Sequence, residues 1–406
     1  MVHHVIIGGG QAAGSAAATL REESPDAEIT VLAAEPHPPY QRPPLSKGYL
    51  AGVEGLDAVV LHAADWYRER EVDLRADTRA TGIDTSGHRL TLADGADLAY
   101  DTLLIATGAS PRRLRLPGAH VRGVHALRTI EDADAIAADL RGGDRRVVVV
   151  GTGWIGMEVA ATARGFGNDV TVLGRGPVPL AGALGAEMGE VFAGLHRENG
   201  VTVRTSAPVE AIVGDGAVSA VVAGGETVPA DVVVTGVGAT PRTSLAERAG
   251  IRVLDGIVVD EHLRTSAPDV FAAGDVASAY HPFVQRHLRS EHWDNARAGG
   301  EVAARSMLGG DARHDGIPYF YTDQFDLGME LSGFPTLMHD ADVVVRGDVD
   351  AREFIAFWHD DGRVVGGMNV NVWDVHDDIQ ALIRSGARVD ADRLRDPGVE
   401  LAGLAA

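Results

Sequence analysis

The chain reads Gly8-Gly9-Gly10-Gln11-Ala12-Ala13 near its start and Gly151-Thr152-Gly153-Trp154-Ile155-Gly156 further along. Each stretch follows an apolar run and precedes a helix-like segment. In a strand-turn-helix unit, such glycines let bare backbone approach a pyrophosphate at the helix N-terminus. The first stretch has Ala13 in place of the third glycine, and alanine is still small enough for close packing. Two such stretches predict two dinucleotide sites in one chain.

The composition excludes several kinds of chemistry. The 406 residues include no cysteine, which excludes a redox-active disulfide, a thiolate nucleophile and a cysteine-ligated iron–sulfur cluster within the chain. The 58 acidic and 36 basic residues give a formal charge of -22, which disfavours nucleic-acid binding. No apolar run approaches the roughly 20 residues of a membrane helix, and the start of the chain lacks the basic region of a secretion signal. We expect a cytoplasmic protein without membrane insertion.

Short Val- and Ile-rich runs alternate with Ala-rich helical stretches, a pattern typical of helices packed on mainly parallel sheets. Predicted strands cover residues 5–10, 29–32 and 102–108 around the first glycine stretch, and 145–150, 169–173 and 231–236 around the second. From Tyr319 onward, aromatic and β-branched residues with acidic turns predict a small α+β domain. The predicted fold class is α/β, with two Rossmann-like dinucleotide-binding domains and a small α+β C-terminal domain.

Two features follow the first glycine stretch. Glu35 lies near the usual spacing, roughly 20 residues on, at which an acid accepts hydrogen bonds from a ribose; a loop glutamate is the alternative. The proline-rich segment that follows carries Arg42 and Lys47, and Lys47 is the only lysine in the chain. A compact ammonium can lie close to a flavin and stabilise its anionic reduced ring. The alternative for Lys47 is a lysine on a surface turn with no such role.

Further motifs stand in a fixed order along the chain. They are Arg42-Pro43-Pro44-Leu45-Ser46-Lys47, Ala106-Thr107-Gly108, Glu158 after the second glycine stretch, Phe271-Ala272-Ala273-Gly274-Asp275-Val276 and Glu291-His292-Trp293-Asp294-Asn295-Ala296. With the two glycine stretches, they make the chain resemble the FAD-dependent NAD(P)H:ferredoxin reductases that serve oxygenases and cytochromes P450, of the putidaredoxin reductase and rubredoxin reductase type.

The resemblance implies a discontinuous FAD-binding domain at residues 1–108 and 241–317, an NAD(P)-binding domain at 109–240 and a C-terminal domain at 318–406. It also implies which residues contact each cofactor. For FAD these are Gly8, Gly10, Ala12, Ala13, Glu35, Arg42, Lys47, Ala80, Ala106, Thr107, Gly108, Arg128, Gly274, Asp275 and Trp293. For NAD(P) they are Gly151, Gly153, Ile155, Gly156, Glu158 and Gly238. Arg175 is predicted to contact NAD(P) as well, on the basis of a departure from the family pattern. No metal site is expected, and the acids at 374–378 are interpreted as the start of a helix over 379–384.

Two of these residues are predicted to be catalytic. Glu158 lies two residues after Gly156 and resembles a family glutamate that faces the flavin and the nicotinamide. Paired with Lys47, it would adjust the charge around flavin N5 during hydride transfer. The alternative for Glu158 is an ordinary acid in the first turn of a helix, where the helix dipole favours negative charge.

The end of the second strand of the second nucleotide fold departs from the NADH-specific pattern. NADH-specific members usually carry an acid there, whereas this chain reads Gly174-Arg175. An acid would repel a 2′-phosphate, and Arg175 could pair with one. We therefore expect that NADPH is accepted and can be preferred over NADH. A solvated loop arginine is the alternative.

The electron acceptor implied by the resemblance is a small [2Fe-2S]-type ferredoxin. Docking an acidic ferredoxin on so acidic a chain requires a local basic patch. Candidates for that patch are Arg112, Arg113, Arg115, Arg286 and Arg289. The segment 318–324 resembles an aromatic stretch near the flavin edge, with Tyr321 where a tryptophan is common; simple core packing is the alternative.

Two other functions stay open at the level of sequence. One is an NAD(P)H oxidase or dehydrogenase that passes electrons to oxygen or a small oxidant. The other is an interaction flavoprotein resembling apoptosis-inducing factor, in which the flavin fold serves a binding role.

Overall fold

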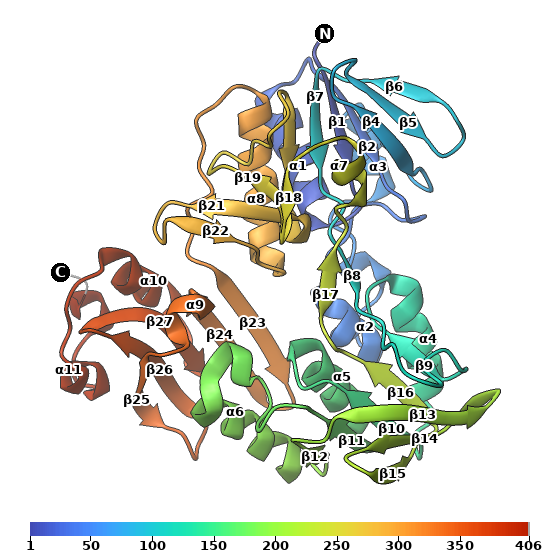
Figure 1. Ribbon diagram of the computed structural model, residues 1–406. Helices are drawn as coiled ribbons and strands as arrows, with labels where there is room; N and C mark the ends of the chain where they lie inside the picture. The colour runs from blue at the N-terminus through green and yellow to red at the C-terminus, as the bar shows by residue number, and fades with distance from the viewer. Residues whose placement is uncertain (405–406) are drawn as a thin grey trace. The chain divides into compact units, whose positions relative to one another are not determined.

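The computed structural model describes residues 1–404 of the chain and divides into two compact units. The first unit contains residues 1–44, 54–110 and 239–316, and the second contains residues 45–53, 111–238 and 317–406. Each unit holds one of the two glycine stretches (Figure 1). The division into three domains at the boundaries given above stays a prediction.

The first unit is built on a parallel five-stranded sheet with the strand order β20-β7-β1-β2-β3. The strands are β1 (His3–Ile7), β2 (Glu28–Leu32), β3 (Val72–Arg75), β7 (Thr102–Ile105) and β20 (Val270–Ala272). The side chains of β1 and β7 are almost all buried, in keeping with the apolar runs Val5–Ile7 and Leu103–Ile105 that end these strands. The first glycine turn joins β1 to helix α1 (Gln11–Glu23).

Helix α1 packs against helix α8 (Trp293–Met307) within the first unit (Figure 1). A Cβ atom at Gly300 would lie 2.4 Å from the carbonyl oxygen of Ala12, so a side chain there would separate the helices. Ala12 and Ala13 are themselves buried. The small residues of the first glycine stretch therefore allow the helix contact as well as the turn.

Smaller elements complete the first unit. An antiparallel sheet of three strands lies between the third and fourth strands in sequence, and a mixed sheet of four strands follows later. The elements are β4 (Ala80–Asp84), β5 (Arg89–Leu92), β6 (Asp97–Ala99), β18 (Val253–Leu254), β19 (Gly256–Val259), β21 (Ala277–His281), β22 (Arg286–Leu288), α3 (Ala64–Glu69) and α7 (Ser244–Arg248). A two-stranded ribbon pairs β8 (Ala109–Pro111) with β17 (Ala239–Pro241).

The second unit repeats this plan with the order β12-β11-β10-β16-β9. Its strands are β9 (Val124–Ala126), β10 (Arg146–Val150), β11 (Asp169–Leu173), β12 (Thr202–Arg204) and β16 (Val232–Thr235); its helices are α2 (Gly48–Ala51), α4 (Ile130–Leu140), α5 (Trp154–Gly165) and α6 (Ala181–Glu198). A three-stranded antiparallel sheet again interrupts the series, here between β12 and β16: β13 (Val209–Asp215), β14 (Ala217–Ala223) and β15 (Glu226–Pro229). The chain thus contains two copies of one doubly wound fold.

The C-terminal part of the second unit is an antiparallel sheet with the order β23-β24-β27-β26-β25 and helices at its side (Figure 1). Its elements are β23 (Tyr319–Gln324), β24 (Leu327–Gly333), β25 (Asp342–Asp348), β26 (Glu353–Asp360), β27 (Arg363–Val370), α9 (Pro335–Met338), α10 (His376–Ser385) and α11 (Ala391–Arg395). Helix α5 packs against β23. The predicted α/β class with a small α+β C-terminal part is confirmed.

The helix predicted over 379–384 begins earlier, at His376, and therefore includes Asp377 and Asp378 in its first turn. These carboxylates are favoured there by the helix dipole. Within residues 1–404, none of the helices is both long and apolar enough to cross a membrane.

Candidate functional site

The first glycine turn leaves the start of helix α1 bare. A Cβ atom at Gly8 would lie 2.3 Å from the carbonyl oxygen of Ala106, so a side chain there would clash with β7's end. Within residues 1–404, no side chain caps the helix at Gly10, and the buried Oε1 of Gln11 has no hydrogen-bond partner. Uncapped backbone N–H groups with no Cβ in front of them fit a pyrophosphate. The turn therefore fits the phosphates of a dinucleotide.

A cluster of polar side chains follows strand β2 in the first unit. Glu35 accepts hydrogen bonds from the Tyr40 hydroxyl and from Arg42, whose guanidinium nitrogen lies 3.1 Å from Oε1. The Arg42 guanidinium also lies 4.7 Å from the centre of the Tyr40 ring. Tyr40 is fully buried, and burial raises its pKa well above the usual range. Two predicted residues, Glu35 and Arg42, are thus held together by Tyr40, which the sequence interpretation did not select.

The remaining predicted FAD residues of the first unit lie at strand and helix ends. Ala106, Thr107 and Gly108 follow β7, and the Thr107 hydroxyl donates to the carbonyl of Arg242 at 3.0 Å. Gly274 has a φ of +76°. A Cβ at Gly274 would lie 3.2 Å from the Cβ of Ala12, so this glycine approaches the first turn closely.

Asp275 is buried in a short 3-10 helix next to Gly274 and interacts electrostatically with Arg42. Ala80 is the first residue of β4, in the first unit. Arg128 lies in the second unit, where its backbone N–H donates to the Asp132 side chain at 3.0 Å. The predicted roles of Ala80 and Arg128 at FAD rest on the resemblance alone.

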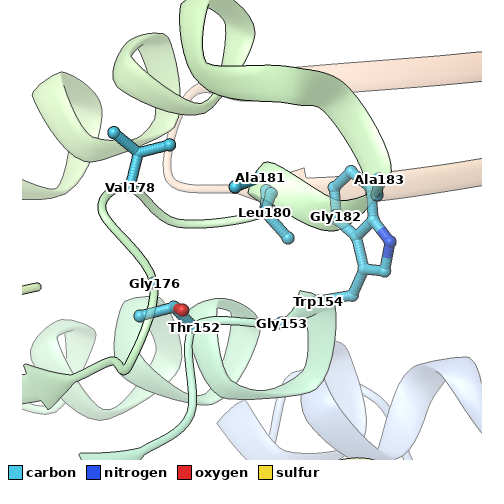
Figure 2. Close-up of a pocket in the computed structure, with 9 residues that line it drawn as sticks. All are labelled: Thr152, Gly153, Trp154, Gly176, Val178, Leu180, Ala181, Gly182 and Ala183. Atoms are coloured by element: carbon cyan, nitrogen blue, oxygen red, sulfur yellow. The ribbon is translucent and has the colours of Figure 1, made fainter. Parts of the chain in front are cut away.

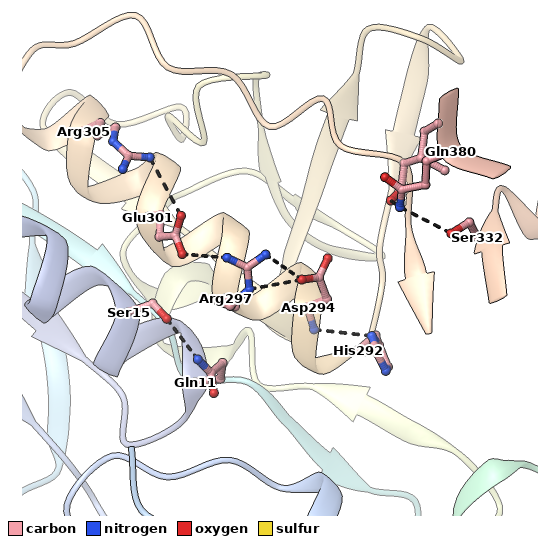
Figure 3. A network of polar contacts seen from close by, with 10 residues as sticks. Gln11, Ser15, His292, Asp294, Arg297, Glu301, Arg305, Ser332 and Gln380 are labelled. Carbon is pink, nitrogen blue, oxygen red and sulfur yellow. Dashed lines mark hydrogen bonds and ion pairs between the residues drawn. The ribbon is translucent and has the colours of Figure 1, made fainter. Parts of the chain in front are cut away.

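Helix α8 begins at Trp293 with an ordered polar ladder (Figure 3). The His292 Nδ1 accepts from the backbone N–H of Asp294 at 3.4 Å, which caps the helix. Arg297 pairs with Asp294 at 2.8 Å and with Glu301 at 2.9 Å, and its guanidinium lies 5.8 Å from the centre of the Trp293 ring. The ladder fixes the first turns of the helix that carries Trp293.

The second glycine turn is tighter than the first. A Cβ at Gly151, whose φ is +118°, would lie 2.2 Å from the carbonyl oxygen of Gly236. A Cβ at Gly156 would lie 2.2 Å from the carbonyl oxygen of Gly151, whereas the equivalent position of the first turn holds Ala13. A side chain at Gly156 would force α5 away from the end of β10, and one at Gly151 would clash with the backbone that follows β16.

A cavity of about 280 Å³ opens beside this turn (Figure 2). It is lined by Thr152, Gly153, Trp154, Gly176, Val178, Leu180, Ala181, Gly182 and Ala183. Among the described residues, no side chain caps helix α5 at Gly153. An uncapped helix start facing an open cavity fits a second dinucleotide.

Three other predicted NAD(P) residues belong to the second unit but do not line this cavity. Ile155 is an exposed apolar side chain in the first turn of α5. Gly238 has a φ of +99°, and a Cβ there would lie 3.7 Å from the Arg112 side chain. Arg175 is exposed directly after β11.

A second arginine lies next to the end of β11. Strand β12 pairs with β11 so that Arg204 stands opposite Leu173, and the backbone N–H of Gly174 donates to the Arg204 carbonyl at 2.9 Å. The Arg204 guanidinium is paired with the exposed Glu226. The sequence interpretation missed Arg204, because only the strand register brings residue 204 beside residue 173.

Lys47 and Glu158 form a buried ion pair in the second unit. The Lys47 Nζ lies 2.7 Å from Glu158 Oε1, and the two side chains are 15% and 2% exposed. The Ser46 hydroxyl donates to Oε2 at 2.5 Å and the Thr322 hydroxyl donates to Oε1 at 2.7 Å. The Lys47 ammonium also lies 5.4 Å from the centre of the Tyr321 ring. The pairing predicted from sequence is present, and Ser46 and Thr322 are additional donors that it did not identify.

Helix α5 holds both partners of this ion pair in place. Glu158 projects from its second turn, and the Thr162 hydroxyl one turn later donates to the carbonyl of Ser46 at 3.0 Å. Lys47 directly follows Ser46 and precedes the short helix α2, which packs against α5. Burial raises the pKa of Asp323, and the neighbouring Lys47 opposes that rise.

Ion pairs reduce the net positive charge of the predicted basic patch. Arg289 pairs with Glu291 and with Asp255, the latter at 3.0 Å, so most of its charge is compensated. Arg113, Arg115 and Arg286 are exposed. The patch as a docking surface stays a prediction.

The sequence and the structure match known reductases over nearly the whole chain. The family described as pyridine nucleotide-disulphide oxidoreductase matches residues 2–300, and the domain described as reductase C-terminal matches residues 319–405. The probable ferredoxin reductase CtmF of Castellaniella defragrans is 37% identical, covering 99% of this chain and 98% of the relative. The reductase component of the anthranilate 1,2-dioxygenase system of Burkholderia cepacia, named as a ferredoxin–NAD(+) reductase, is 37% identical over 98% of each chain.

The crystal structure of a covalent complex between putidaredoxin reductase and putidaredoxin provides a structural match. Its TM-score is 0.95 at 32% identity, and the match covers 99% of this chain and 98% of the solved chain. Both the sequence and the fold therefore agree with the resemblance that the motifs carry.

Proposed function

Because the chain belongs to the ferredoxin reductases of the pyridine nucleotide-disulphide oxidoreductase family, we propose a division of roles between its two glycine turns. The enzyme passes electrons from NAD(P)H through FAD to a small iron–sulfur ferredoxin, which in turn supplies an oxygenase or a cytochrome P450. The first turn holds FAD and the second holds the nicotinamide nucleotide. FAD, when bound, accepts the two electrons of a hydride and releases them singly.

The observation that carries this proposal is the pair of uncapped helix starts, one in each unit. Within residues 1–404, neither Gly10 nor Gly153 is followed by a side-chain cap, and a Cβ at either residue would meet no atom within 4 Å. Each start therefore offers backbone N–H groups to an anion. Two such sites suit two dinucleotides that exchange electrons.

Within the second unit, we assign charge control to the Lys47–Glu158 ion pair. Lys47 supplies a compact positive charge that stabilises negative charge as it develops during hydride transfer, and Glu158 holds that ammonium in position. Buried ion pairs of this kind are expensive to desolvate, so three donors on one carboxylate support a functional reason for the pair. Tyr321 lies beside the ammonium and limits its movement.

For the nucleotide itself, we propose that NADPH is accepted as well as NADH. The position after β11 carries Gly174 and the exposed Arg175, with no carboxylate to repel a 2′-phosphate. Arg204, beside the same strand end, adds positive charge that Glu226 partly compensates. Steady-state rates with the two nucleotides test this point, and a strong preference for NADH would contradict it.

The electron-transfer function is tested by reconstitution. The FAD-loaded enzyme, NADPH or NADH and cytochrome c are mixed with and without a [2Fe-2S] ferredoxin. We expect cytochrome c reduction to depend on the ferredoxin. Rapid oxidation of the nucleotide in air without ferredoxin would instead favour an oxidase, and slow turnover with every acceptor would favour an interaction flavoprotein.

A further inference from the structure

A chain of buried polar side chains extends from Glu158 into the second unit, away from Lys47. It consists of His196 on helix α6 and of Gln324 and Thr322 on strand β23, and we call these three residues the buried relay. All three are at most 1% exposed. Because a buried polar side chain costs free energy unless it is satisfied, three adjoining ones need a reason beyond packing.

The hydrogen bonds of the buried relay all run in one direction. The Oε1 of Gln324 can only accept, so the contact of 2.8 Å with His196 requires an N–H on His196 Nε2. Gln324 Nε2 then donates to the Thr322 hydroxyl at 3.2 Å. The Thr322 hydroxyl in turn donates to Glu158 Oε1 at 2.7 Å.

Because all three hydrogen bonds run toward Glu158, the positive end of each bond dipole points to the Glu158 carboxylate. Donors in series polarise one another, so each bond strengthens the next in a dry interior. The Nδ1 of His196 is buried and makes no hydrogen bond within residues 1–404, so the bond through Nε2–H is the ring's single hydrogen bond among them. Burial also lowers the pKa of His196, so the ring is neutral at neutral pH and donates only through Nε2.

The alternation of strand β23 places the relay and the Lys47 contact on opposite faces. Thr322 and Gln324 are buried, whereas Tyr321 and Asp323 are more exposed. Tyr321 lies beside the Lys47 ammonium, and Thr322 contacts the carboxylate that binds the same ammonium. One strand therefore restrains both ends of the ion pair, and α5 packs directly on it.

We infer that the buried relay is a positioning device that fixes the Glu158 carboxylate and, through it, the Lys47 ammonium. Its three members touch neither the ammonium nor a nucleotide-binding turn. Without the Thr322 hydroxyl, Glu158 keeps Lys47 on Oε1 and the Ser46 hydroxyl on Oε2, so one of the three contacts that restrain its terminal torsion is lost. The inference rests on the role proposed for Lys47 and Glu158, and it adds His196, Gln324 and Thr322 to the residues on which that role depends.

The single lysine of the chain makes a direct test possible. Enzyme made with lysine labelled with carbon-13 at Cε gives one lysine side-chain signal, that of Lys47. The signal is recorded for FAD-loaded wild type, Thr322→Val, Gln324→Met and His196→Leu. We expect it to move or broaden in all three variants, most in Thr322→Val, and to return to the wild-type position in Thr322→Ser.

Flavin reduction by NADPH is followed in parallel by anaerobic stopped flow. Losing one hydrogen bond to a charged group is expected to slow reduction by Thr322→Val about tenfold, with the KM for the nucleotide within about twofold of wild type. Phe325→Leu is the matched control, because Phe325 packs edge to face on the His196 ring and makes no hydrogen bond in the relay. We expect this control to leave the Lys47 signal in place.

The inference is overturned if the folded, FAD-loaded Thr322→Val and Gln324→Met variants keep the wild-type Lys47 signal and reduction rate. It is also overturned if Phe325→Leu moves the signal as much as His196→Leu does, since packing would then explain the effect. If Lys47→Met itself leaves reduction unchanged, the proposed role of Lys47 fails, while the Lys47 signal in the relay variants still decides whether the relay positions the ammonium.

Discussion

The two nucleotide folds share one strand order but use the same helix position differently. In the first unit, the residue two places after Ala13 is Ser15, and a Cβ at Gly300 would lie 3.0 Å from its Cβ. In the second, the residue two places after Gly156 is Glu158, buried against donors from β23 and from the segment that holds Lys47. One copy of the helix uses small residues to pack on another helix; the other copy buries a charge. The scaffold therefore sets where a dinucleotide binds, and the residues packed on the helix set the chemistry.

The largest effect is expected where the second copy differs most from the first, at Lys47. Lys47→Met removes the ammonium and leaves the Glu158 carboxylate with the Ser46 and Thr322 hydroxyls. Flavin reduction by NAD(P)H should slow by about 100-fold, the size typical for loss of one preorganised electrostatic contact. Stopped-flow reduction measures this rate constant.

Lys47→Arg is the control for charge. A guanidinium keeps the charge but is too broad for the space that the ammonium shares with the Tyr321 ring. We expect an intermediate rate. If Lys47→Met reduces its flavin at the wild-type rate, the charge buried on α5 has no role in hydride transfer, and the functional difference between α1 and α5 is contradicted.

The next largest effect is expected from Arg175, which follows β11 as Glu35 follows β2 in the first unit. Glu35 follows β2 and is already bound by Arg42, whereas Arg175 follows β11 and is exposed. Arg175→Ala should raise the KM for NADPH about tenfold and leave the KM for NADH nearly unchanged, since only NADPH carries the 2′-phosphate. Arg145→Ala, an exposed arginine before β10, is the matched control. An equal rise in the KM for NADPH and for NADH would mean that Arg175 does not bind the 2′-phosphate.

His314 of the first unit is expected to make the stability of the protein depend on pH. Burial, helped by the neighbouring His281, lowers the pKa of His314 from 6.5 to about 4, and His314 contacts Asn295 of helix α8 at 2.9 Å. The unfolded chain binds this proton more tightly, so the stabilisation is complete above pH 6.5 and is lost as the pH falls from 6.5 toward 4.

The test is the thermal midpoint at pH 7 and pH 5. Gln at position 314 keeps a donor for Asn295 but does not titrate, so His314→Gln should lose less stability on acidification, by about 2–4 °C in midpoint. An identical acid-induced decrease in wild type and variant would show that His314 does not titrate during unfolding.

The smallest effect concerns Arg204, which stands opposite Leu173 of β11 as Arg75 stands opposite Leu32 of β2 in the first unit. Its charge is partly compensated by Glu226, which is 70% exposed. Glu226→Gln should lower the KM for NADPH about twofold, because exposed ion pairs contribute little. The KM for NADH serves as the internal reference, and a rise in the NADPH value would show that Arg204 does not face the nucleotide.

Sequence patterns predicted the parts of the site that are local in the chain. The glycine turns, the strands beside them and the acid two residues after Gly156 follow from short-range spacing. Of the partners of that acid, Lys47 was predicted through the family resemblance, but Thr322 was not, because it is 164 residues from Glu158 in sequence and meets it only through the packing of β23 on α5.

The same reason explains the other residues that sequence reasoning missed. In the sequence, Tyr40 is a single aromatic residue in a proline-rich loop. Its hydrogen bond to Glu35 is visible only in the folded structure. Arg204 depends on the register between β11 and β12. Register and side-chain direction arise from the packing of distant segments, which one sequence does not reveal.

The central claim is that the first turn holds FAD and the second holds the nicotinamide nucleotide. The most direct measurement is the FAD content and the single-turnover reduction kinetics of purified Gly151→Ala. A Cβ there would lie 2.2 Å from the carbonyl oxygen of Gly236, so the second turn must open. We predict one FAD per chain, as in wild type, with the KM for NAD(P)H raised about tenfold or more. Loss of FAD from this variant, with unchanged nucleotide kinetics in the remaining loaded enzyme, would contradict the assignment.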